Sequence, residues 1–201
     1  MGIYGPNTFG TSDDSPWAPT PLETARLFLR AITLEDAPAI FDYAKNPNIS
    51  RFTQWEPHQS IEDTYAFFND YVLPRYRNQN PEPLGIALKS DPGRIVGTVG
   101  CFWNTAESRC MELAYAISEP LWGKGLVPEA ANAIIAQILK ETNAIRVQAR
   151  CVVENTASAR VMEKVGMTRE ATLRSALWYR GRAWDMYLYA LTPCARPPKR
   201  S

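Results

Sequence analysis

Apolar side chains recur along this chain at two spacings, and the shorter spacing marks the strands. Alternating or β-branched runs bounded by turn residues predict about seven strands. These runs are Leu27 to Ile32, Leu84 to Lys89, Arg94 to Trp103, Cys110 to Ile117, Ile145 to Val153, Thr168 to Leu173 and Ala183 to Leu191. Short polar turns separate the second, third and fourth runs, so we expect these three to form an antiparallel meander.

The longer spacing, close to the 3.6-residue period of a helix, predicts about four helices between the strands. They begin near Thr33, Ser60, Val127 and Asn155. The second is predicted to stop at Pro74, because proline has no N–H to continue the helical hydrogen bonds. This order predicts an α/β (α+β) fold with a mixed, mostly antiparallel central sheet.

Prolines gather at the two ends of the chain. Seven of the 16 prolines lie in the first 21 and the last nine residues, and proline-rich segments favour extended chain. We expect residues 1–21 to form an extended arm, residues 22–192 to form one packed domain, and residues 193–201 to be a flexible tail.

The balance of charge limits the classes of partner. The chain carries 22 basic and 21 acidic side chains, a formal net charge of +1, which predicts no strong hold on nucleic acid or on an anionic membrane. No apolar run approaches the roughly 18 residues of a membrane span. No Lys or Arg precedes Arg26, which argues against a secretory signal. We expect a cytoplasmic monomer or homodimer.

The cysteines are scattered and contain no C-x-x-C pair. They are Cys101, Cys110, Cys151 and Cys194, and the chain has one histidine, His58. This distribution predicts no metal site. A hairpin turn near Thr105 would bring Cys101 and Cys110 face to face, although buried, reduced thiols in a reducing compartment are the favoured interpretation.

The segment that says most about chemistry is Pro120 to Ala130, between a predicted strand and a predicted helix. Gly123 and Gly125 allow the backbone to point successive N–H groups at one spot, where the helix dipole is also positive. Each charge-assisted bond contributes about 1.5–3 kcal/mol, so these N–H groups, with Lys124 as an accessory, predict a phosphate or pyrophosphate cradle. Pro128 and Gly125 exclude the dinucleotide fingerprint and the Walker loop. Taken alone, the glycines also fit a plain strand-to-helix turn.

Four short motifs follow one another between about Leu22 and Leu191. They are Arg26-Leu27-Phe28-Leu29-Arg30, Glu112-Leu113-Ala114-Tyr115, Trp122-Gly123-Lys124-Gly125 with Glu129-Ala130, and Asn155-Thr156-Ala157-Ser158. In this order they resemble the GNAT superfamily of acyl-CoA N-acyltransferases, in particular its RimJ/RimL-type branch of protein N-terminal alanine acetyltransferases. The resemblance implies a GNAT fold with about seven strands and four helices, splayed between strands 4 and 5, and acetyl transfer from acetyl-CoA to a primary amine.

The resemblance also implies which residues bind acetyl-CoA. The backbone of Ala116, Ile117 and Ser118 would pair with the pantetheine, Gly123, Lys124, Gly125 and Leu126 would hold the pyrophosphate, and Asn155 and Ser158 would reach the thioester end. Asn155 is also placed as a helix N-cap, and both roles are open.

Two positions depart from the family's pattern. The loop's leading Gln or Arg is Pro120 here, which removes a side chain but leaves the N–H groups of the loop in place. The tyrosine that protonates the leaving thiolate in many members is Met162 here. Ser158 resembles the serine given that role in the Rim-type branch, and we assign it accordingly.

Glu112 is the carboxylate that we expect to act as general base, through water. Its alternative role is that of a solvent-facing strand carboxylate. Some Rim-type members place a glutamate base between the last two strands, where this chain has Leu177. Strand alternation turns Tyr115 to the opposite face from Glu112, so Tyr115 is expected in the core. A weak base suffices for an α-amine, of which about 10% is neutral at pH 7, against under about 0.1% of lysine.

Aromatic segments at Arg51 to Glu56 and Arg174 to Trp184 are expected to flank the acceptor, and Trp55 and Trp178 are assigned to bind it. The resemblance implies a protein N-terminus as acceptor. The alternatives are a small amine, such as an antibiotic, a polyamine or an amino acid, and a non-catalytic acyl-CoA-binding module.

Overall fold

A computed structural model describes residues 19–78, 80, 82–105 and 109–192 of the chain. An eight-stranded sheet with the order β1-β2-β3-β4-β5-β6-β8-β7 runs through it. The strands are β1 (Leu22–Glu23), β2 (Leu27–Ala31), β3 (Leu84–Leu88), β4 (Asp91–Thr105), β5 (Cys110–Ile117), β6 (Arg146–Val152), β7 (Thr168–Tyr179) and β8 (Arg182–Leu191). The seven expected strands are present, and the short β1 adds an eighth by pairing Leu22 with Leu29. The predicted mixed, mostly antiparallel fold is confirmed.

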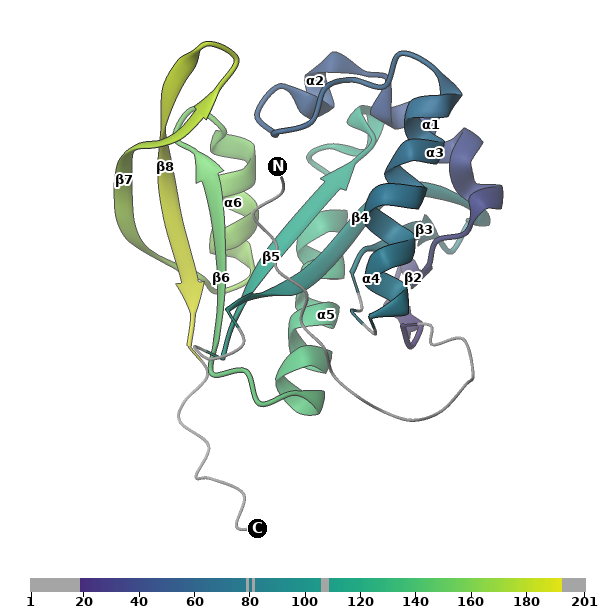
Figure 1. The fold of residues 1–201 in the computed structure, drawn as a ribbon. Coiled ribbons are helices and arrows are strands. Elements are labelled where there is room, and N and C mark those ends of the chain that lie inside the picture. The colour runs from purple at the N-terminus through teal and green to yellow at the C-terminus, as the bar shows by residue number, and fades with distance from the viewer. Residues whose placement is uncertain (1–18, 79, 81, 106–108, 193–201) are drawn as a thin grey trace.

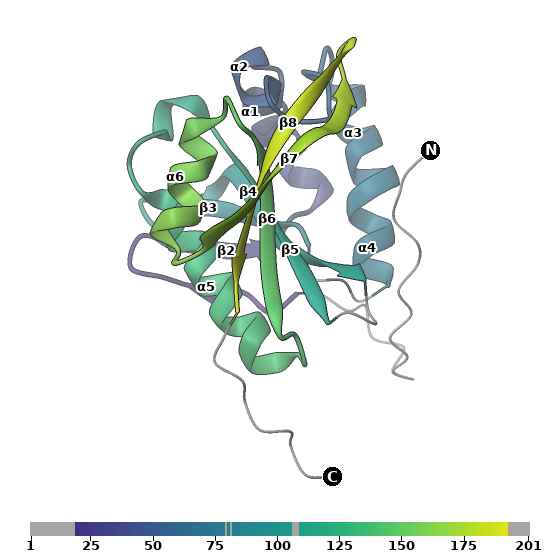
Figure 2. The same cartoon turned by 90° about the vertical axis from the view of Figure 1, so that its left-hand side faces the viewer.

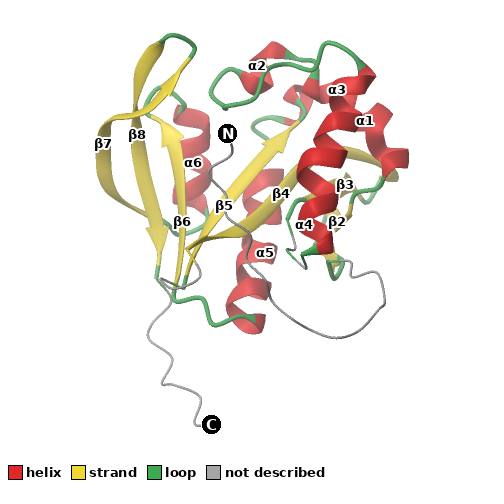
Figure 3. Cartoon of the chain, viewed as in Figure 1, coloured by secondary structure: helices red, strands yellow, loops and turns green. Residues whose placement is uncertain are grey.

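Helices cover both faces of this sheet (Figures 1 and 3). They are α1 (Ala37–Ala44), α2 (Pro47–Ser50), α3 (Ile61–Phe67), α4 (Leu73–Arg77), α5 (Leu126–Glu141) and α6 (Thr156–Lys164), with the 3₁₀ turns η1 (Leu34–Asp36) and η3 (Glu119–Leu121) and the π turn η2 (Phe68–Val72). The alternation of β2 explains the two layers, because successive side chains point to opposite faces. Leu27 and Leu29 pack in the core beneath α5, whereas Phe28 packs in the core beneath α1 and α3.

The second predicted helix does not stop at Pro74 but continues to Arg77. In a regular α-helix the ring of Pro74 would collide with the carbonyl of Asp70. The π turn before it removes that conflict, because the Leu73 N–H bonds to the Phe68 carbonyl, five residues earlier. A proline can therefore lie inside a helical rod when the preceding turn is widened.

The sheet splits between β5 and β6, as predicted. These parallel strands pair only from Cys110–Glu112 to Arg146–Gln148, although β5 continues to Ile117 and β6 to Val152. Figure 1 shows the two strands close at one end and diverging toward the other, with α5 behind the gap. The split leaves strand edges facing an opening instead of a neighbouring strand.

The cysteines do not face each other across the β4–β5 hairpin. Cys101 lies opposite Leu113, and Cys110 lies opposite Thr105, so that expectation is wrong. Cys101, Cys110 and Cys151 are buried free thiols, whereas Cys194 lies outside the described residues.

Most of the N-terminal arm and all of the C-terminal tail also fall outside the described residues, so both stay predictions. In the part of the chain that is described, no helix is both long enough and apolar enough to cross a membrane.

Candidate active site

A large cavity opens where β5 and β6 separate. Its volume is about 1380 Å³, and its walls include the N-terminal ends of α5 and α6 and parts of α1 and α3. Small-molecule sites commonly have volumes of about 300–1,000 Å³. The cavity is therefore large enough for an extended ligand and a second molecule beside it.

The loop ahead of α5 presents backbone N–H groups at this cavity. Gly123 and Gly125 have φ angles of +75° and +73°, where a side chain would be strained. Both line the cavity with Leu126, and a Cβ built on Gly123 meets no atom within 4 Å. Lys124 is exposed and does not line it. Within the described chain the N–H groups of residues 123–126 have no hydrogen-bond acceptor, as an anion cradle requires.

Arg26 holds this loop from the side away from the cavity. Its Nη1 donates to the Lys124 carbonyl at 2.9 Å and its Nη2 to the Gly125 carbonyl at 3.2 Å. In a trans peptide the N–H points opposite to the carbonyl of the same unit. The N–H groups of Gly125 and Leu126 are therefore turned away from Arg26.

Arg26 is itself fixed by Glu129 in the first turn of α5. The carboxylate of Glu129 accepts the backbone N–H of Arg26 at 2.8 Å and its Nε at 2.6 Å. The Thr24 hydroxyl donates to the same carboxylate at 2.6 Å. Burial opposes ionisation of Glu129, but these donors outweigh it and hold its pKa below the usual range. These bonds connect the first sequence motif, through Arg26, to the glycine loop and Glu129 of the third motif.

The three residues expected to pair with pantetheine are not equivalent. Ala116 and Ile117 line the cavity, but Ser118 does not. The Ser118 N–H donates to the Val96 carbonyl at 2.8 Å, so it is already used. The Ile117 carbonyl accepts the Trp122 indole N–H at 2.9 Å, which ties the end of β5 to the glycine loop.

Asn155 and Ser158 lie together at the start of α6 and line the cavity. Asn155 Oδ1 accepts the Ser158 N–H at 3.1 Å, so Asn155 is the N-cap of the helix. The Ser158 hydroxyl is 2.8 Å from the Tyr115 hydroxyl. The Tyr115 ring packs against the core as expected, but its hydroxyl reaches the cavity wall, whereas Met162 is fully buried.

Glu112 lies at the fork between β5 and β6. It is opposite Gln148 in the last parallel pair of the two strands, and only 7% of it is exposed. Its carboxylate accepts Arg150 Nε at 2.9 Å and Gln148 Nε2 at 3.2 Å. The alternative of a solvent-facing carboxylate is therefore wrong, because Glu112 is buried, lines the cavity and joins the two strands where they part.

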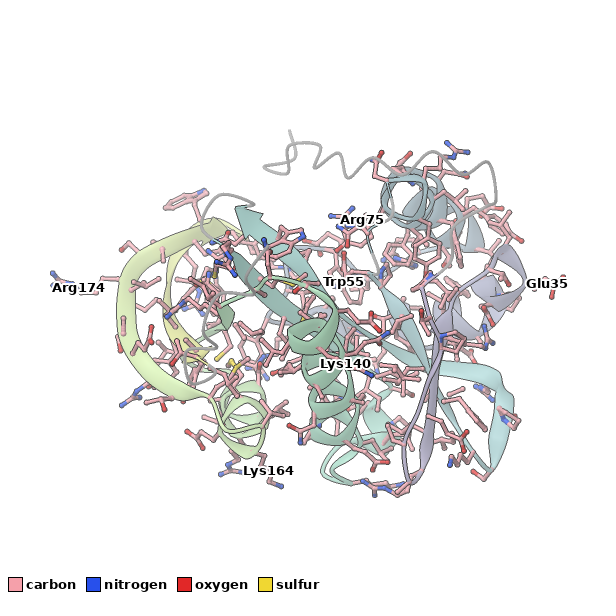
Figure 4. All side chains as sticks on the ribbon, turned by 90° about the horizontal axis from the view of Figure 1, so that it is seen from below. Glu35, Trp55, Arg75, Lys140, Lys164 and Arg174 are labelled. Carbon is pink, nitrogen blue, oxygen red and sulfur yellow. The ribbon has the colours of Figure 1, made fainter. Side chains whose placement is uncertain are left out.

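The two tryptophans assigned to the acceptor lie in different surroundings. Trp55 lines the cavity, between the two halves of the molecule in Figure 4, with its ring 5.8 Å from that of His58. Burial lowers the pKa of His58, whose Nδ1 is 2.8 Å from Thr64 Oγ1. Trp178 is 74% exposed and does not line the cavity, whereas its neighbour Leu177 does.

Two segments that are far apart in the sequence, and that each supply residues to the cavity lining, contact each other. Tyr179 donates to the Glu56 carboxylate at 2.8 Å, and Arg180 Nη2 does so at 2.9 Å. The Arg180 guanidinium, and after it the Tyr179 hydroxyl, lower the pKa of Glu56. Phe52 and Trp184 meet edge to face at 6.3 Å. Figure 2 shows the tip of the β7–β8 hairpin at the same end of the molecule as α2, and these contacts join the hairpin to the segment that follows α2.

Charged residues that the sequence reasoning missed line the two ends of the cavity. Arg160 and Lys164 lie at the α6 end, and their spacing of four residues on a helix could have revealed them as one basic face. Asp63, Asp70 and Glu82 lie at the α1–α4 end. The lining is therefore basic on α6 and carries three carboxylates at the far end, of which Glu82 is paired with Arg75. Glu119 adds a carboxylate near the glycine loop.

Nothing in the sequence marks Glu82 as a buried residue of the site. It is 2% exposed and pairs with Arg75 Nε at 2.8 Å and the Tyr71 hydroxyl at 2.5 Å. A Cβ on Gly100 would fall 2.1 Å from Glu82 Cγ, so Gly100 makes room for it. Burial raises the pKa of Glu82, against the opposing effect of Arg75.

Over the described ranges, no three His, Cys, Asp or Glu side chains are grouped so that they could hold a metal ion. The polar groups of the cavity instead suit an anion at one end and a cation at the other.

Known proteins share this sequence pattern. A family profile described as an acetyltransferase (GNAT) domain matches residues 26–168, more than half of the chain. The N-acetyltransferase YnaD of Bacillus subtilis, named as uncharacterised, is 29% identical over 170 residues, which cover 85% of this chain and 95% of YnaD.

Solved structures share the fold. A GNAT-family acetyltransferase from Bacillus anthracis has a TM-score of 0.76 and 26% identity, covering 86% of this chain and 98% of its own. RimL, a ribosomal L7/L12 α-N-protein acetyltransferase in complex with coenzyme A, has a TM-score of 0.72 and 20% identity over 84% of this chain and 95% of its own. Spermidine N-acetyltransferase from Vibrio cholerae, with CoA and spermine, has a TM-score of 0.69 and 20% identity over 84% and 96%. This chain belongs to the GNAT family of acetyltransferases and is an acetyl-CoA-dependent acyltransferase.

Proposed function

We propose that the acceptor of this N-acetyltransferase is the α-amine of a protein N-terminus. The observation that carries the proposal is the bridge of Glu56 with Tyr179 and Arg180, which joins two segments that supply residues to the cavity lining. A bridged opening favours a slender group, such as a free chain end, over a side chain on a folded surface. RimL, which shares the fold, is named as an α-N-protein acetyltransferase, and the motif order resembles that branch.

The walls at the acceptor end support a cationic amine. Trp55 and Phe67 offer aromatic faces, and Asp63, Asp70 and Glu82 offer carboxylates. An ammonium group is stabilised by both kinds of neighbour. An arriving amine would therefore be drawn to this end, away from the basic residues of α6.

The opposite end fits acetyl-CoA. The open space in front of Gly123 and the unpaired N–H groups of residues 123–126 suit its pyrophosphate, and Arg160 and Lys164 suit its further phosphate. We assign the backbone of Ala116 and Ile117, together with Asn155, to the pantetheine region as proposals. Ser118 is left out of this assignment, because its N–H is bonded to Val96 and it lies outside the cavity lining. When bound, acetyl-CoA supplies an activated thioester.

The residues between the two ends would move the protons. We propose that Glu112 takes the proton of the attacking amine through water and that Ser158 supports the departing sulfur. A carboxylate is a weak base, and a weak base suffices for an α-amine with a pKa of about 8. The reaction needs no metal in this scheme.

The test is a panel of peptides with labelled acetyl-CoA, followed by thiol release and by mass spectrometry of the acetylated position. Each peptide is offered with a free and with a blocked N-terminus, and each contains one lysine. We expect acetylation of free N-termini only. Faster acetylation of the lysine, or of a small amine, than of any free N-terminus would overturn the proposed acceptor.

A polyamine or another small amine is the second candidate, because three carboxylates line one end of the cavity. Including spermidine and aminoglycosides in the same panel compares this candidate directly with the peptides.

We also propose that the enzyme works in the cytoplasm, as a monomer or homodimer. The buried, unpaired thiols of Cys101, Cys110 and Cys151 support a reducing compartment.

A further inference from the structure

Two hydroxyl groups from different elements meet at the wall of the cavity. The Tyr115 hydroxyl, from β5, lies 2.8 Å from Ser158 Oγ and 3.1 Å from the Ser158 carbonyl, on α6. Tyr115 follows Glu112 on the part of β5 that has left β6. This contact joins the two elements across the split in the sheet.

The number of protons at this contact decides which hydroxyl can donate to a third group. A phenol has one proton to donate, and so does the hydroxyl of serine. The longer contact, to the Ser158 carbonyl, can use only the Tyr115 proton, whereas either hydroxyl can donate in the shorter contact. When Tyr115 donates to Ser158 Oγ, the proton of Ser158 is left to point elsewhere, and both side chains line the cavity. Burial raises the pKa of Tyr115 above its usual range, against the opposing effect of Ser158. Tyr115 therefore stays a neutral donor and does not give up its proton.

The backbone N–H of Ser158 is bonded separately from its hydroxyl. Its N–H is used by Asn155 Oδ1. The nearby Cys151 thiol also lines the cavity, and burial raises the pKa of that thiol to about 11, against the opposing effect of Ser158. Ser158 thus already faces one sulfur atom from β6, in the cavity that the thioester sulfur would share. Met162, where many family members have their proton donor, is fully buried and supplies no proton.

We propose that Tyr115 is a positioning residue for the chemical step: it holds Ser158 Oγ so that the serine O–H points at the sulfur that leaves acetyl-CoA. This inference rests on the proposed chemistry of Ser158. As the new N–C bond forms, the C–S bond breaks and its electron pair stays on sulfur, where the Ser158 O–H stabilises it. The amine proton leaves through water to Glu112, and a solvent proton completes the CoA thiol.

The test compares single and double variants. Tyr115→Phe keeps the ring and removes the hydroxyl, and we expect kcat to fall about tenfold, the effect of one lost hydrogen bond, while KM for acetyl-CoA changes less than about twofold. Ser158→Ala should lower kcat about a hundredfold. Because Tyr115 acts through Ser158, the double variant should be no slower than Ser158→Ala alone.

The matched control is Tyr189→Phe. Tyr189 is buried and its hydroxyl donates to Glu163 at 3.0 Å, outside the cavity, so this variant should keep the kcat of the parent enzyme. If Tyr115 had a merely structural role, Tyr115→Phe would behave like Tyr189→Phe. It could lower stability, but it would not lower kcat while leaving KM unchanged. Thermal melting of every variant identifies loss of fold.

An unchanged kcat in folded Tyr115→Phe, or a loss that multiplies with that of Ser158→Ala, would overturn the proposal. The measurement is made with whichever acceptor the panel favours, because the sulfur leaves in every case. If no acceptor is acetylated, the proposed function fails, and slow hydrolysis of acetyl-CoA, followed by thiol release, still compares the same variants.

Discussion

The two ends of the cavity are built in different ways. At the end that we propose for acetyl-CoA, one strand, one loop and one helix that follow each other in the chain supply Ile117, Gly123, Gly125 and Leu126. At the end that we propose for the acceptor, Glu56 and Arg180 meet although 124 positions separate them. A contiguous backbone motif can be recognised in the sequence, whereas a site assembled from distant side chains exists only after folding. The comparison predicts that changes at the first end act on cofactor affinity and changes at the second act on acceptor use.

The largest effect is expected from Gly123→Asp. A carboxylate beside the cradle would repel a diphosphate and cost at least two charge-assisted bonds, each about 1.5–3 kcal/mol. The affinity for CoA should fall by about 100-fold or more, measured by titration calorimetry. Gly123 is preferable to Gly125, whose Cβ would lie 3.7 Å from Arg26 Nη2, a cation that could neutralise the new charge.

The control for that variant is Gly166→Asp. Gly166 has a φ of +81° and lies outside the cavity, so it imposes the same backbone strain without a charge beside the cofactor. Equal loss of CoA affinity in both variants would mean that strain, not repulsion, explains the effect.

Glu112→Gln is expected to lower kcat about 30-fold at pH 7. This is less than the roughly 100-fold or more of a well-aligned base, because an α-amine needs little help. Arg150→Ala breaks the same ion pair but keeps the carboxylate, so it should retain most of kcat. Steady-state kinetics at saturating substrates separates the two, and equal losses would assign Glu112 to joining the strands only.

Arg26→Ala tests whether the glycine loop needs support from behind. The variant frees the carbonyls of Lys124 and Gly125, and the loop can then turn its N–H groups away from the cavity. KM for acetyl-CoA should rise about tenfold, as expected for one lost charge-assisted bond, with kcat little changed. Arg26→Lys should not restore the KM for acetyl-CoA, because lysine lacks the planar, forked guanidinium that reaches both carbonyls. Arg94→Ala, which removes an exposed pair with Asp42, is the control.

Glu56→Ala opens the bridge at the acceptor end. Because this pair is exposed, its effect should be small: about a threefold change in KM for the acceptor, no change in CoA affinity, and a smaller difference from the parent enzyme at high salt. Glu62→Ala, on the exposed surface of α3, is the matched control. A change in CoA affinity would contradict the separation of the two ends.

The smallest effect concerns stability and pH. Burial opposes ionisation of Asp36, but its bonds from Arg30 and the Thr33 N–H outweigh it and lower its pKa. A lowered folded-state pKa gives stability that is present above the unfolded pKa and is lost as pH falls through the folded pKa. Asp36→Asn should therefore melt about 3–6 °C lower than the parent at pH 7, and the gap should narrow as the pH falls below about 3.9, the ordinary pKa of aspartate. Glu35→Gln, at a side chain that points to solvent in Figure 4, should show no gap.

The sequence predicted the backbone features better than the side-chain partnerships. Apolar periodicity located the strands, and the glycines located the loop that lines the cavity ahead of α5, because both features follow from local geometry. The bond from Tyr115 to Ser158 could not be predicted, since alternation assigns a face to Tyr115 but not how far its hydroxyl extends. The burial of Glu82 depends on the missing side chain of Gly100, and the exposure of Trp178 depends on a hairpin that continues beyond the predicted strand end at Leu173.

A crystal structure of the enzyme with coenzyme A and an acceptor peptide would test the central claim most directly. We expect the diphosphate within hydrogen-bonding distance, about 3 Å, of the N–H groups of Gly123, Gly125 and Leu126, and the peptide N-terminus between Glu112 and the sulfur. A diphosphate bound elsewhere, with these N–H groups facing only water, would contradict the account.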